Sequence, residues 1–479
     1  MTRVMAVFPL LLCFCISGCM VGPNFTRPEP AVPDTWVDAN AESTTQPTVA
    51  EAALQEWWTV FNDAKLTALV QEAFQSNLDL QIATTRIRQA RASRGIAVSG
   101  IGPTVDTSGS FRRTQADSGG SNSRSSTFST YLAGFDAGWE IDIFGGVRRG
   151  IEAADAQLQA AVENRRNVLV TLAAEVARNY IELCTFQQRL AITSQNLTAQ
   201  KHSAELTRRR FEGGFVSGLD VANANAQVAT TEAQIPLLES NVRQTIYALS
   251  VLVGREPGAL LLELSKTAVI PPVPPAIPTG VPSDLLRRRP DIRLAEADIH
   301  AATANIGVAE ADLFPRVTIS ASVGWNADNA SDLFSATSRF WSFGPSVSWN
   351  LFQTGRTLSD IELHKALQDE SIIAYRQTVL TAIQEVENAL IASTKEQEHY
   401  QSLQAAVIAT RKAVELATAL YTEGQTDFLD VLIAQRALFL SEDSLAQSNQ
   451  VMAVELIALY KALGGGWRRE EVVTSGEEK

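Results

Sequence analysis

The sequence predicts a mixed α and β fold, in which long coiled-coil helices continue into a transmembrane β-barrel shared between chains, with four strands from each chain. Three observations carry this prediction. A turn motif occurs twice, 210 residues apart, heptad repeats flank both copies, and four segments alternate apolar with small polar residues. We therefore expect a tandem repeat, each half containing a helix, two strands, a long helix, a tight turn and another helix.

The duplication is centred on the motif that runs from Phe211 to Ala224 and returns from Tyr421 to Ala434. The two copies coincide at Gly214/Gly424, Leu219/Leu429, Asp220/Asp430, Val221/Val431 and Ala224/Ala434. Apolar residues spaced seven apart precede both copies. They are Val162, Leu169, Val176, Leu183, Leu190, Leu197, Ala204 and Phe211. The positions 210 residues later are apolar or aromatic except for Ser393, and they end at Tyr421. Heptads in the same phase predict helices packed as a left-handed coiled coil.

The four alternating segments are residues 104–113, 131–143, 316–325 and 341–351. Aromatic residues at the ends and small polar residues on the opposite face are typical of membrane β-strands, and about 10 residues suffice for a tilted crossing. Soluble hairpins packed on helices are the alternative. Four strands cannot enclose water, since about eight are needed, and open edges in lipid cost several kcal/mol per unpaired group. Spanning strands would therefore require a barrel shared between chains.

The helical segments predict a conduit rather than a pocket. Segment 150–212 would be roughly 95 Å long at 1.5 Å per residue. Segments 74–101 and 219–253 together contain the same number of residues. Two shorter helices placed end to end would thus match one long helix.

The amino-terminal residues resemble a bacterial lipoprotein signal peptide. Arg3 precedes an apolar core that is too short to span a membrane, and Ser17-Gly18-Cys19 resembles a lipobox. We expect lipidation of Cys19 and, because Met20 rather than Asp follows, no retention in the inner membrane. Several acyl chains anchor a protein firmly in lipid. The alternative is an ordinary secretory signal with an incidental Cys.

These features set the expected domain boundaries. The expected parts are a signal peptide (1–18), a lipidated extended segment (19–56), repeat 1 (57–263), a Pro-rich linker (264–286), repeat 2 (287–463) and a flexible carboxyl-terminal tail (464–479). After export, Cys184 is the single free thiol, which excludes an intramolecular disulfide.

Composition excludes several classes of function. The 479 residues are 45% hydrophobic and carry a net charge of −13, so wholesale disorder and a basic nucleic-acid binder are excluded. Four Cys and four His show no metal-ligand spacing, and no phosphate loop or catalytic constellation occurs. We expect no enzyme, no cofactor and no nucleic-acid partner. The basic cluster Arg287-Arg288-Arg289 is expected to form salt bridges with nearby helices.

Several motifs together resemble one family. They are Cys19 to Phe25, Trp57-Trp58, Trp139 to Gly145, Arg287 to Ile292, Ala309 to Pro315 and both turn motifs. In this order they resemble the TolC-like outer-membrane efflux and secretion channels, and more narrowly the lipoprotein branch that serves resistance–nodulation–division multidrug pumps. The resemblance covers essentially the whole chain after the signal peptide.

The resemblance implies a homotrimer with a 12-stranded β-barrel in the outer membrane and a 12-helix tunnel in the periplasm. It implies two partners, a periplasmic adaptor (membrane fusion) protein and an inner-membrane pump of the resistance–nodulation–division type. The channel would pass drugs or other toxic small solutes to the exterior. Two alternatives stay open, an exit duct for type I protein secretion and, from another class, a soluble periplasmic coiled-coil scaffold.

The resemblance also implies roles for the turn residues. Asp430, Ile433 and Tyr421 correspond to the periplasmic aperture, with Ile433 where several relatives carry a second acidic residue. The turns would face the adaptor through Gly213, Gly214, Phe215, Gly424, Gln425 and Thr426. Local alternatives exist. Asp430, like Asp220, could cap a helix, Tyr421 could end a heptad series, and both Gly214 and Gly424 could terminate helices.

Overall fold

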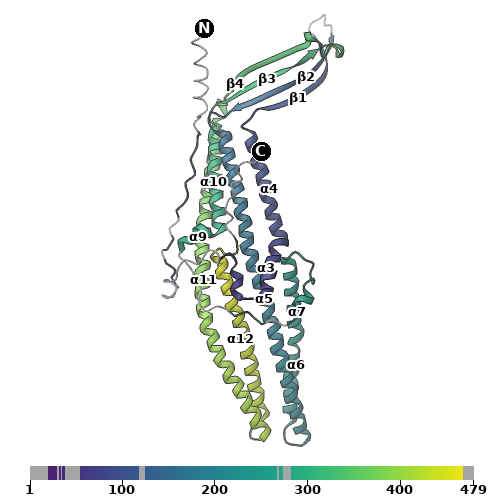
Figure 1. The fold of residues 1–479 in the computed structure, drawn as a ribbon, viewed down its shortest axis with the longest axis vertical. Helices are drawn as coiled ribbons and strands as arrows, with labels where there is room; N and C mark the ends of the chain where they lie inside the picture. The colour runs from purple at the N-terminus through teal and green to yellow at the C-terminus, as the bar shows by residue number, and fades with distance from the viewer. Residues whose placement is uncertain are drawn as a thin grey trace. The chain divides into compact units, whose positions relative to one another are not determined.

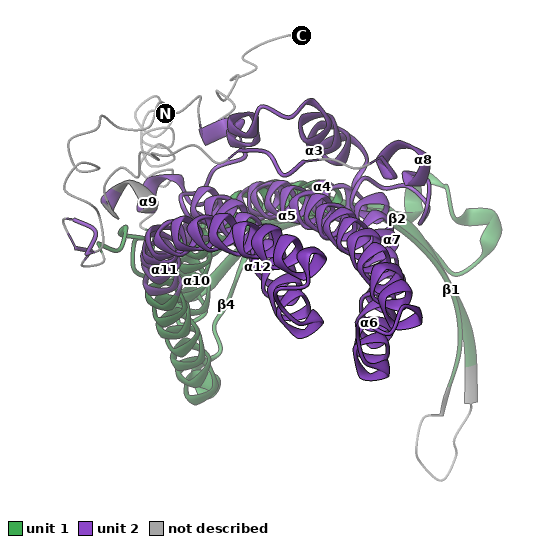
Figure 2. Ribbon diagram, turned by 90° about the horizontal axis from the view of Figure 1, so that it is seen from below, with its two compact units in different colours: residues 1–29, 85–162, 294–377 green, residues 30–84, 163–293, 378–479 purple. Residues whose placement is uncertain are grey.

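A computed structural model describes residues 20–29, 32–33, 35–37, 54–117, 125–266, 269–272 and 282–467. The predicted signal peptide, Cys19, most of the Pro-rich linker and the end of the predicted tail lie outside these residues. The chain forms two compact units (Figure 2). Unit 1 contains residues 1–29, 85–162 and 294–377, and unit 2 contains residues 30–84, 163–293 and 378–479. Each unit draws on both halves of the sequence.

Unit 1 contains an antiparallel sheet with the order β1-β2-β3-β4 (Figure 1). Its strands are β1 (Thr104–Asp117), β2 (Ser125–Ile141), β3 (Arg316–Ala327) and β4 (Arg339–Ser348). Short 3-10 turns η2 (Ala330–Asp332) and η3 (Ala336–Ser338) connect β3 to β4, and η4 (Leu351–Gln353) follows β4. β2 is longer than predicted because it begins at residue 125, and β4 ends before Trp349.

The two faces of the sheet differ in chemistry, as the alternation predicts. One row across the four strands is Thr107, Phe135, Val323 and Trp341, and the last three side chains are 52%, 54% and 78% exposed. The opposite face carries hydroxyl pairs. Ser322 lies 2.7 Å from Ser342, and Thr318 lies 2.7 Å from Ser346, oxygen to oxygen. One face is therefore exposed and apolar, while the other is a hydrogen-bonded polar surface.

Two tryptophans join the sheet to its supporting helices in repeat-equivalent ways. The Trp139 indole N–H donates to the carbonyl of Ile101 over 2.7 Å, and the Trp349 indole donates to the carbonyl of Leu313 over 3.1 Å. The two donors are 210 residues apart and the two acceptors 212 residues apart. The sequence repeat thus also repeats this hydrogen bond between a tryptophan and the end of the preceding helix.

The helices repeat with the same offsets. α4 (Leu78–Ser99) corresponds to α10 (Pro290–Ala311), and α5 (Gly146–Glu212) to α11 (Thr354–Glu423). α6 (Gly218–Glu232) and α7 (Gln234–Leu252) together correspond to α12 (Phe428–Ala462). Shorter elements are η1 (Trp57–Phe61), α3 (Ala64–Ser76), α8 (Leu261–Leu264) and α9 (Pro282–Arg288). Every member of the heptad series listed above before the first motif is buried or half-buried except Phe211.

The structure divides two of the predicted helices. Residues 74–101 were expected to form one helix, but Asn77 separates α3 from α4 with extended backbone, and its carboxamide oxygen accepts the amide of Leu80 over 3.0 Å. In residues 219–253, Ala233 separates α6 from α7, just before Pro236, which has no amide to continue the helical hydrogen bonds.

Unit 2 has an aromatic core and a buried ion cluster. Trp57, Trp58 and Phe61 of η1 are buried, and the Trp57 ring stacks on Tyr460 at 5.5 Å. Arg289 is also buried. Its guanidinium binds Asp291 and Glu385 and donates to the carbonyl of Ala462, the last residue of α12. For Arg289, the expectation that the basic cluster pairs with neighbouring helices is confirmed.

No helix among the described residues is both long enough and apolar enough to cross a membrane.

Candidate functional site

The predicted site residues gather at two helical turns of unit 2, one between α5 and α6 and one between α11 and α12 (Figure 1). Both turns are the same Schellman motif. Gly214 and Gly424 have left-handed φ values of +76° and +75°. Each glycine amide donates to the carbonyl three residues back, over 2.9 and 3.0 Å, and the next amide donates to the carbonyl five residues back, over 2.8 and 2.9 Å. Glycine is needed here because a side chain would strain this backbone.

The helices that leave the two turns begin differently. Ser217 and Asp220 form a capping box at the start of α6, in which each side chain binds the other residue's amide, over 3.3 and 3.0 Å. At α12 the cap residue is Asp427, which makes no side-chain cap bond, and Asp430 accepts a hydrogen bond from the Thr426 hydroxyl. Asp220 therefore caps the start of α6, whereas the Asp430 carboxylate accepts a hydrogen bond from the Thr426 hydroxyl.

Tyr421 joins the two turns. It is 2% exposed at the end of α11, and its hydroxyl donates to the Thr207 hydroxyl of α5 over 3.2 Å. The Arg210 guanidinium lies 4.5 Å above the centroid of the Tyr421 ring, and it also donates to the Tyr421 backbone carbonyl. The Tyr421 side chain thus donates one hydrogen bond to the facing helix and accepts a cation–π contact from it.

A small apolar cluster supports this contact. Tyr421, Phe428 and Val431 of repeat 2 pack with Ala224 of repeat 1, and the Phe428 ring meets the Tyr421 ring edge to face at 5.6 Å. Other predicted residues lie outside the cluster. Ile433 is 57% exposed and Phe215 is 77% exposed. The structure therefore brings Tyr421 into a packed contact and leaves Ile433 and Phe215 accessible in the single chain.

Further contacts hold α12 against α5 away from the turns. Arg189 binds Asp443 with two hydrogen bonds of 2.7 and 3.1 Å, and the Gln435 carboxamide donates to the Ser203 hydroxyl over 2.9 Å. Because these residues come from opposite repeats, the two helical hairpins of unit 2 are linked at several levels.

Arg210 and Thr207 were not singled out in the sequence. Their repeat-2 equivalents are Leu420 and Ala417, which carry no polar group, so aligning the two motifs does not point to Arg210 or Thr207. The usable signal is this asymmetry. Both polar groups occur in one repeat, whereas the tyrosine that they contact occurs in the other.

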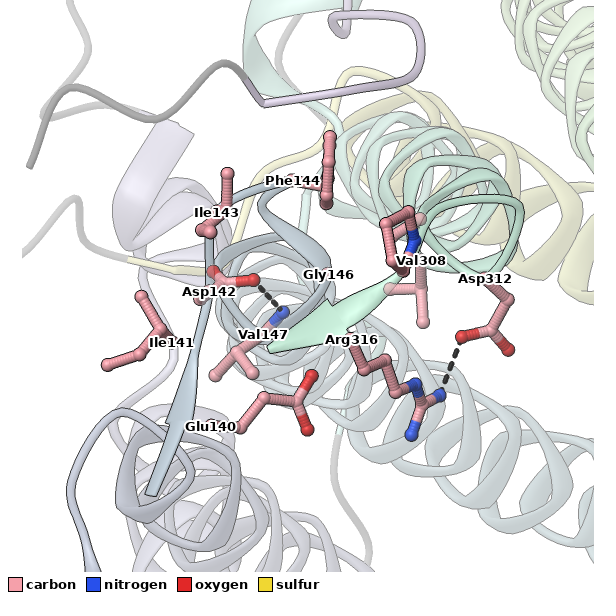
Figure 3. Close-up of a pocket in the computed structure, with 12 residues that line it drawn as sticks. Glu140, Ile141, Asp142, Ile143, Phe144, Gly146, Val147, Val308, Asp312 and Arg316 are labelled. Carbon is pink, nitrogen blue, oxygen red and sulfur yellow. Dashed lines mark hydrogen bonds and ion pairs between the residues drawn. The ribbon is translucent and has the colours of Figure 1, made fainter. Parts of the chain in front are cut away.

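A cavity of about 190 Å³ lies in unit 1, where β2 passes into α5 and α10 passes into β3 (Figure 3). Two of its acidic residues are already engaged. Asp142 accepts the Val147 amide over 3.1 Å at the start of α5, and Asp312 pairs with Arg316 at 2.6 Å. Within the described residues, no group of three or more His, Cys, Asp or Glu side chains is placed to hold a metal ion. The cavity thus lies at the junction of the sheet with α5 and α10, where the Asp142 and Asp312 contacts hold the connecting segments in place.

Comparison with known proteins gives consistent matches. The outer membrane efflux protein family matches the chain twice, over residues 69–255 and 281–465. Nodulation protein T of Rhizobium leguminosarum bv. trifolii is 33% identical over 96% of both chains. Outer membrane protein OprJ of Pseudomonas aeruginosa is also 33% identical over 96% of both chains. The solved outer-membrane channel OprN is 35% identical, with a TM-score of 0.86, over 94% of this chain and all of that chain.

Proposed function

We propose that three copies of this chain assemble into one continuous conduit. The chain belongs to the outer membrane efflux protein family and is an outer-membrane channel of a tripartite efflux system. The sheet supports this assembly. β1 and β4 are its outer strands, and its apolar face is exposed in the single chain. Strand edges in lipid require partners, since unpaired backbone groups there cost several kcal/mol each. Three sheets of four strands would complete a closed barrel.

In this proposal the channel receives solutes from a periplasmic adaptor protein and an inner-membrane pump of the resistance–nodulation–division type. The cargo would be drugs or other toxic small solutes. The protein would act as a passive duct without catalysis or cofactor. Its lipid anchor would be the acylated Cys19, which would hold it in the outer membrane while the helices extend into the periplasm.

The observation that carries the proposed aperture is the contact of Tyr421 with Arg210 and Thr207. In a trimer, this contact would set how far α11 and α12 stand from α5 and α6 at the periplasmic end. Asp430 would then form a ring of negative charge, because three copies of one residue surround the symmetry axis. Ile433, one helical turn further on, would add an apolar ring. Opening would follow when the adaptor engages the turns at Gly213 to Phe215 and Gly424 to Thr426.

The native mass of the full-length product, extracted from membranes in mild detergent, tests the assembly. A lipidated species of about 150 kDa, which is three chains of 51.9 kDa less their signal peptides, is expected only in the detergent extract. A species of about 50 kDa that dissolves without detergent would overturn the proposal, because four strands from one chain cannot form the conduit.

A further inference from the structure

A second cavity of unit 1, the β4–α11 cavity, has a volume of about 360 Å³ and lies where β3 begins, β4 ends and α11 begins. This volume is in the range of about 300–1,000 Å³ that small-molecule sites occupy. The charged and hydroxyl side chains in its lining are Asp312, Arg316, Ser348, Arg356, Thr357 and Asp360. The ion pair of Asp312 with Arg316 separates it from the smaller cavity described above, since both residues line both cavities (Figure 3).

The β4–α11 cavity belongs to the polar face of the sheet. Arg316 and Ser348 are paired across β3 and β4, two residues away from the hydroxyl pair of Thr318 with Ser346. Alternate residues of a strand share a face, so all four side chains lie on the same side of the sheet. In the proposed conduit the exposed apolar face would meet lipid. The polar face, and this cavity with it, would then line the water-filled lumen.

The corresponding corner of repeat 1 is closed by an ion pair. Asp142 accepts the backbone amide of Arg148 over 3.0 Å and pairs with its guanidinium over 3.1 Å. At the offset of 210 residues, the equivalents of these two residues are Phe352 and Leu358. Phe352 is fully exposed and Leu358 is 54% exposed. Repeat 2 therefore cannot form the pair that closes this corner in repeat 1.

Repeat 2 instead carries two charges where repeat 1 has glycines. Arg356 and Asp360 in the first turns of α11 correspond to Gly146 and Gly150. Both side chains line the cavity and both are exposed. Within the part of the chain that the structure describes, neither side chain forms an ion pair with the other or with a third residue. An arginine four residues before an acidic residue is the less favourable order for pairing along a helix. The cavity thus offers one cation and one anion that are not neutralised inside the chain.

These two charges define the chemistry of a matching solute. A guanidinium binds a carboxylate through two parallel N–H···O bonds, and a carboxylate accepts hydrogen bonds from an ammonium group. Residues four apart on a helix are separated by about 6 Å along its axis. Because Asp312 already neutralises Arg316, the four charges of the lining sum to zero. A solute with one positive and one negative group, on the order of 6 Å apart, would leave the site neutral.

We propose that the β4–α11 cavity is a binding site for zwitterionic small solutes, in which Arg356 holds a carboxylate and Asp360 holds an ammonium group. The placement of this site in a lumen rests on the proposed channel function. Three chains would carry three such sites around one axis. Each site is weak, because exposed charge pairs contribute little individually. Weak binding suits a duct, in which a solute must both enter a site and leave it.

Saturation-transfer NMR of the full-length protein in detergent tests the ligand class. The probe is 6-aminohexanoate, a flexible zwitterion. Its controls are 6-aminohexanamide, which keeps only the ammonium group, and adipic acid monoamide, which keeps only the carboxylate. We expect 6-aminohexanoate to bind about fivefold more tightly than either analogue, which is the scale of one exposed charge pair. Equal binding of all three compounds, or no binding of the zwitterion up to high millimolar concentrations, would overturn the proposal.

Four variants test the assigned residues. Arg356→Gln and Asp360→Asn should each weaken binding of 6-aminohexanoate about fivefold. Arg356→Gln should leave 6-aminohexanamide unaffected, and Asp360→Asn should leave adipic acid monoamide unaffected. The matched controls are Arg376→Gln and Asp369→Asn, which remove exposed charges of α11 outside the cavity lining. If the controls weaken binding as much as the cavity variants do, the effect is one of net charge and the site is refuted.

Conductance in planar bilayers separates this site from the channel itself. Addition of 6-aminohexanoate should lower the conductance of the parent pore, with the half-maximal concentration found by NMR, and should affect the Arg356→Gln pore about fivefold less. A conducting pore that shows no binding would refute the site and leave the channel intact. Binding in detergent without any conducting pore would leave the site intact and refute the channel. A pore that binds the probe but conducts unchanged would overturn the luminal placement.

Discussion

Replacing Arg210 with glutamine should loosen the contact between the two helical turns. The substitution removes the guanidinium that lies 4.5 Å from the Tyr421 ring centroid and donates to the Tyr421 carbonyl. A cation–π contact contributes about 0.5–2 kcal/mol, and a charged hydrogen bond about 1.5–3 kcal/mol. Since Arg210 is only half-buried, we take about 2 kcal/mol per chain, which corresponds to a roughly 30-fold shift of the equilibrium toward the released contact.

The measurement is single-channel conductance in planar lipid bilayers, together with sensitivity of expressing cells to vancomycin, which is too large to enter by ordinary pores. Arg210→Gln should raise both. Tyr421→Phe should have a smaller effect, because it removes only the hydroxyl bond to Thr207, worth about 0.5–1.5 kcal/mol. Arg208→Gln is the matched control, since Arg208 is exposed and pairs with Glu205 on its own helix. If Arg210→Gln behaves like the parent, or no differently from Arg208→Gln, the contact does not control the aperture.

Three further predictions concern single side chains. Asp430→Ala should change cation preference and vancomycin leakage, whereas Asp220→Ala should cost only about 1 kcal/mol of helix capping; unchanged leakage in both would demote Asp430 to a local role. Arg289→Gln should lower the apparent free energy of unfolding by about 2 kcal/mol, because it removes a buried guanidinium and leaves the carbonyl of the buried Ala462 without this donor, and a denaturant titration in detergent measures this. Burial and the nearby Glu396 raise the pKa of Glu455 above its ordinary value of 4.5. Glu455 therefore contributes stability below pH 4.5 that is lost as the pH rises through its raised pKa, so Glu455→Gln should flatten the dependence of the unfolding midpoint on pH above 4.5.

The sequence predicted the architecture because the duplication constrains each half with the other. Offsets of 210 and 212 residues in the sequence predict the turn motifs, the long helices and the strands. The same offsets hold for hydrogen bonds, as the pairs Trp139 with Ile101 and Trp349 with Leu313 demonstrate. Periodicity reports which face of an element is buried, and that information is local.

Helix boundaries and contacts that occur in only one repeat could not be predicted from the sequence. The break at Asn77 depends on its carboxamide reaching the Leu252 carbonyl, 175 residues away, which no local pattern encodes. In the sequence, Arg149 is an ordinary charged residue at the start of a helix. In the structure it is buried against Val21 and Gly22, more than 120 residues earlier in the chain. Signals of this kind become visible only when distant segments are placed together.

The two turns have the same backbone conformation but make different side-chain contacts. Gly214 and Gly424 terminate their helices in the same way, so the difference between the turns arises from side chains alone. Phe211 is 48% exposed in the first repeat, while its counterpart Tyr421 is 2% exposed. The tyrosine hydroxyl is a hydrogen-bonding group, and a buried one requires a partner, which Thr207 provides. The Phe-to-Tyr difference between equivalent positions, together with Thr207 and Arg210 on the facing helix, therefore gives the second turn a contact that the first turn lacks. In the proposed channel, an adaptor bound at the turns would be able to break this contact, because a free energy of about a few kcal/mol is of the size that a protein–protein interface can supply.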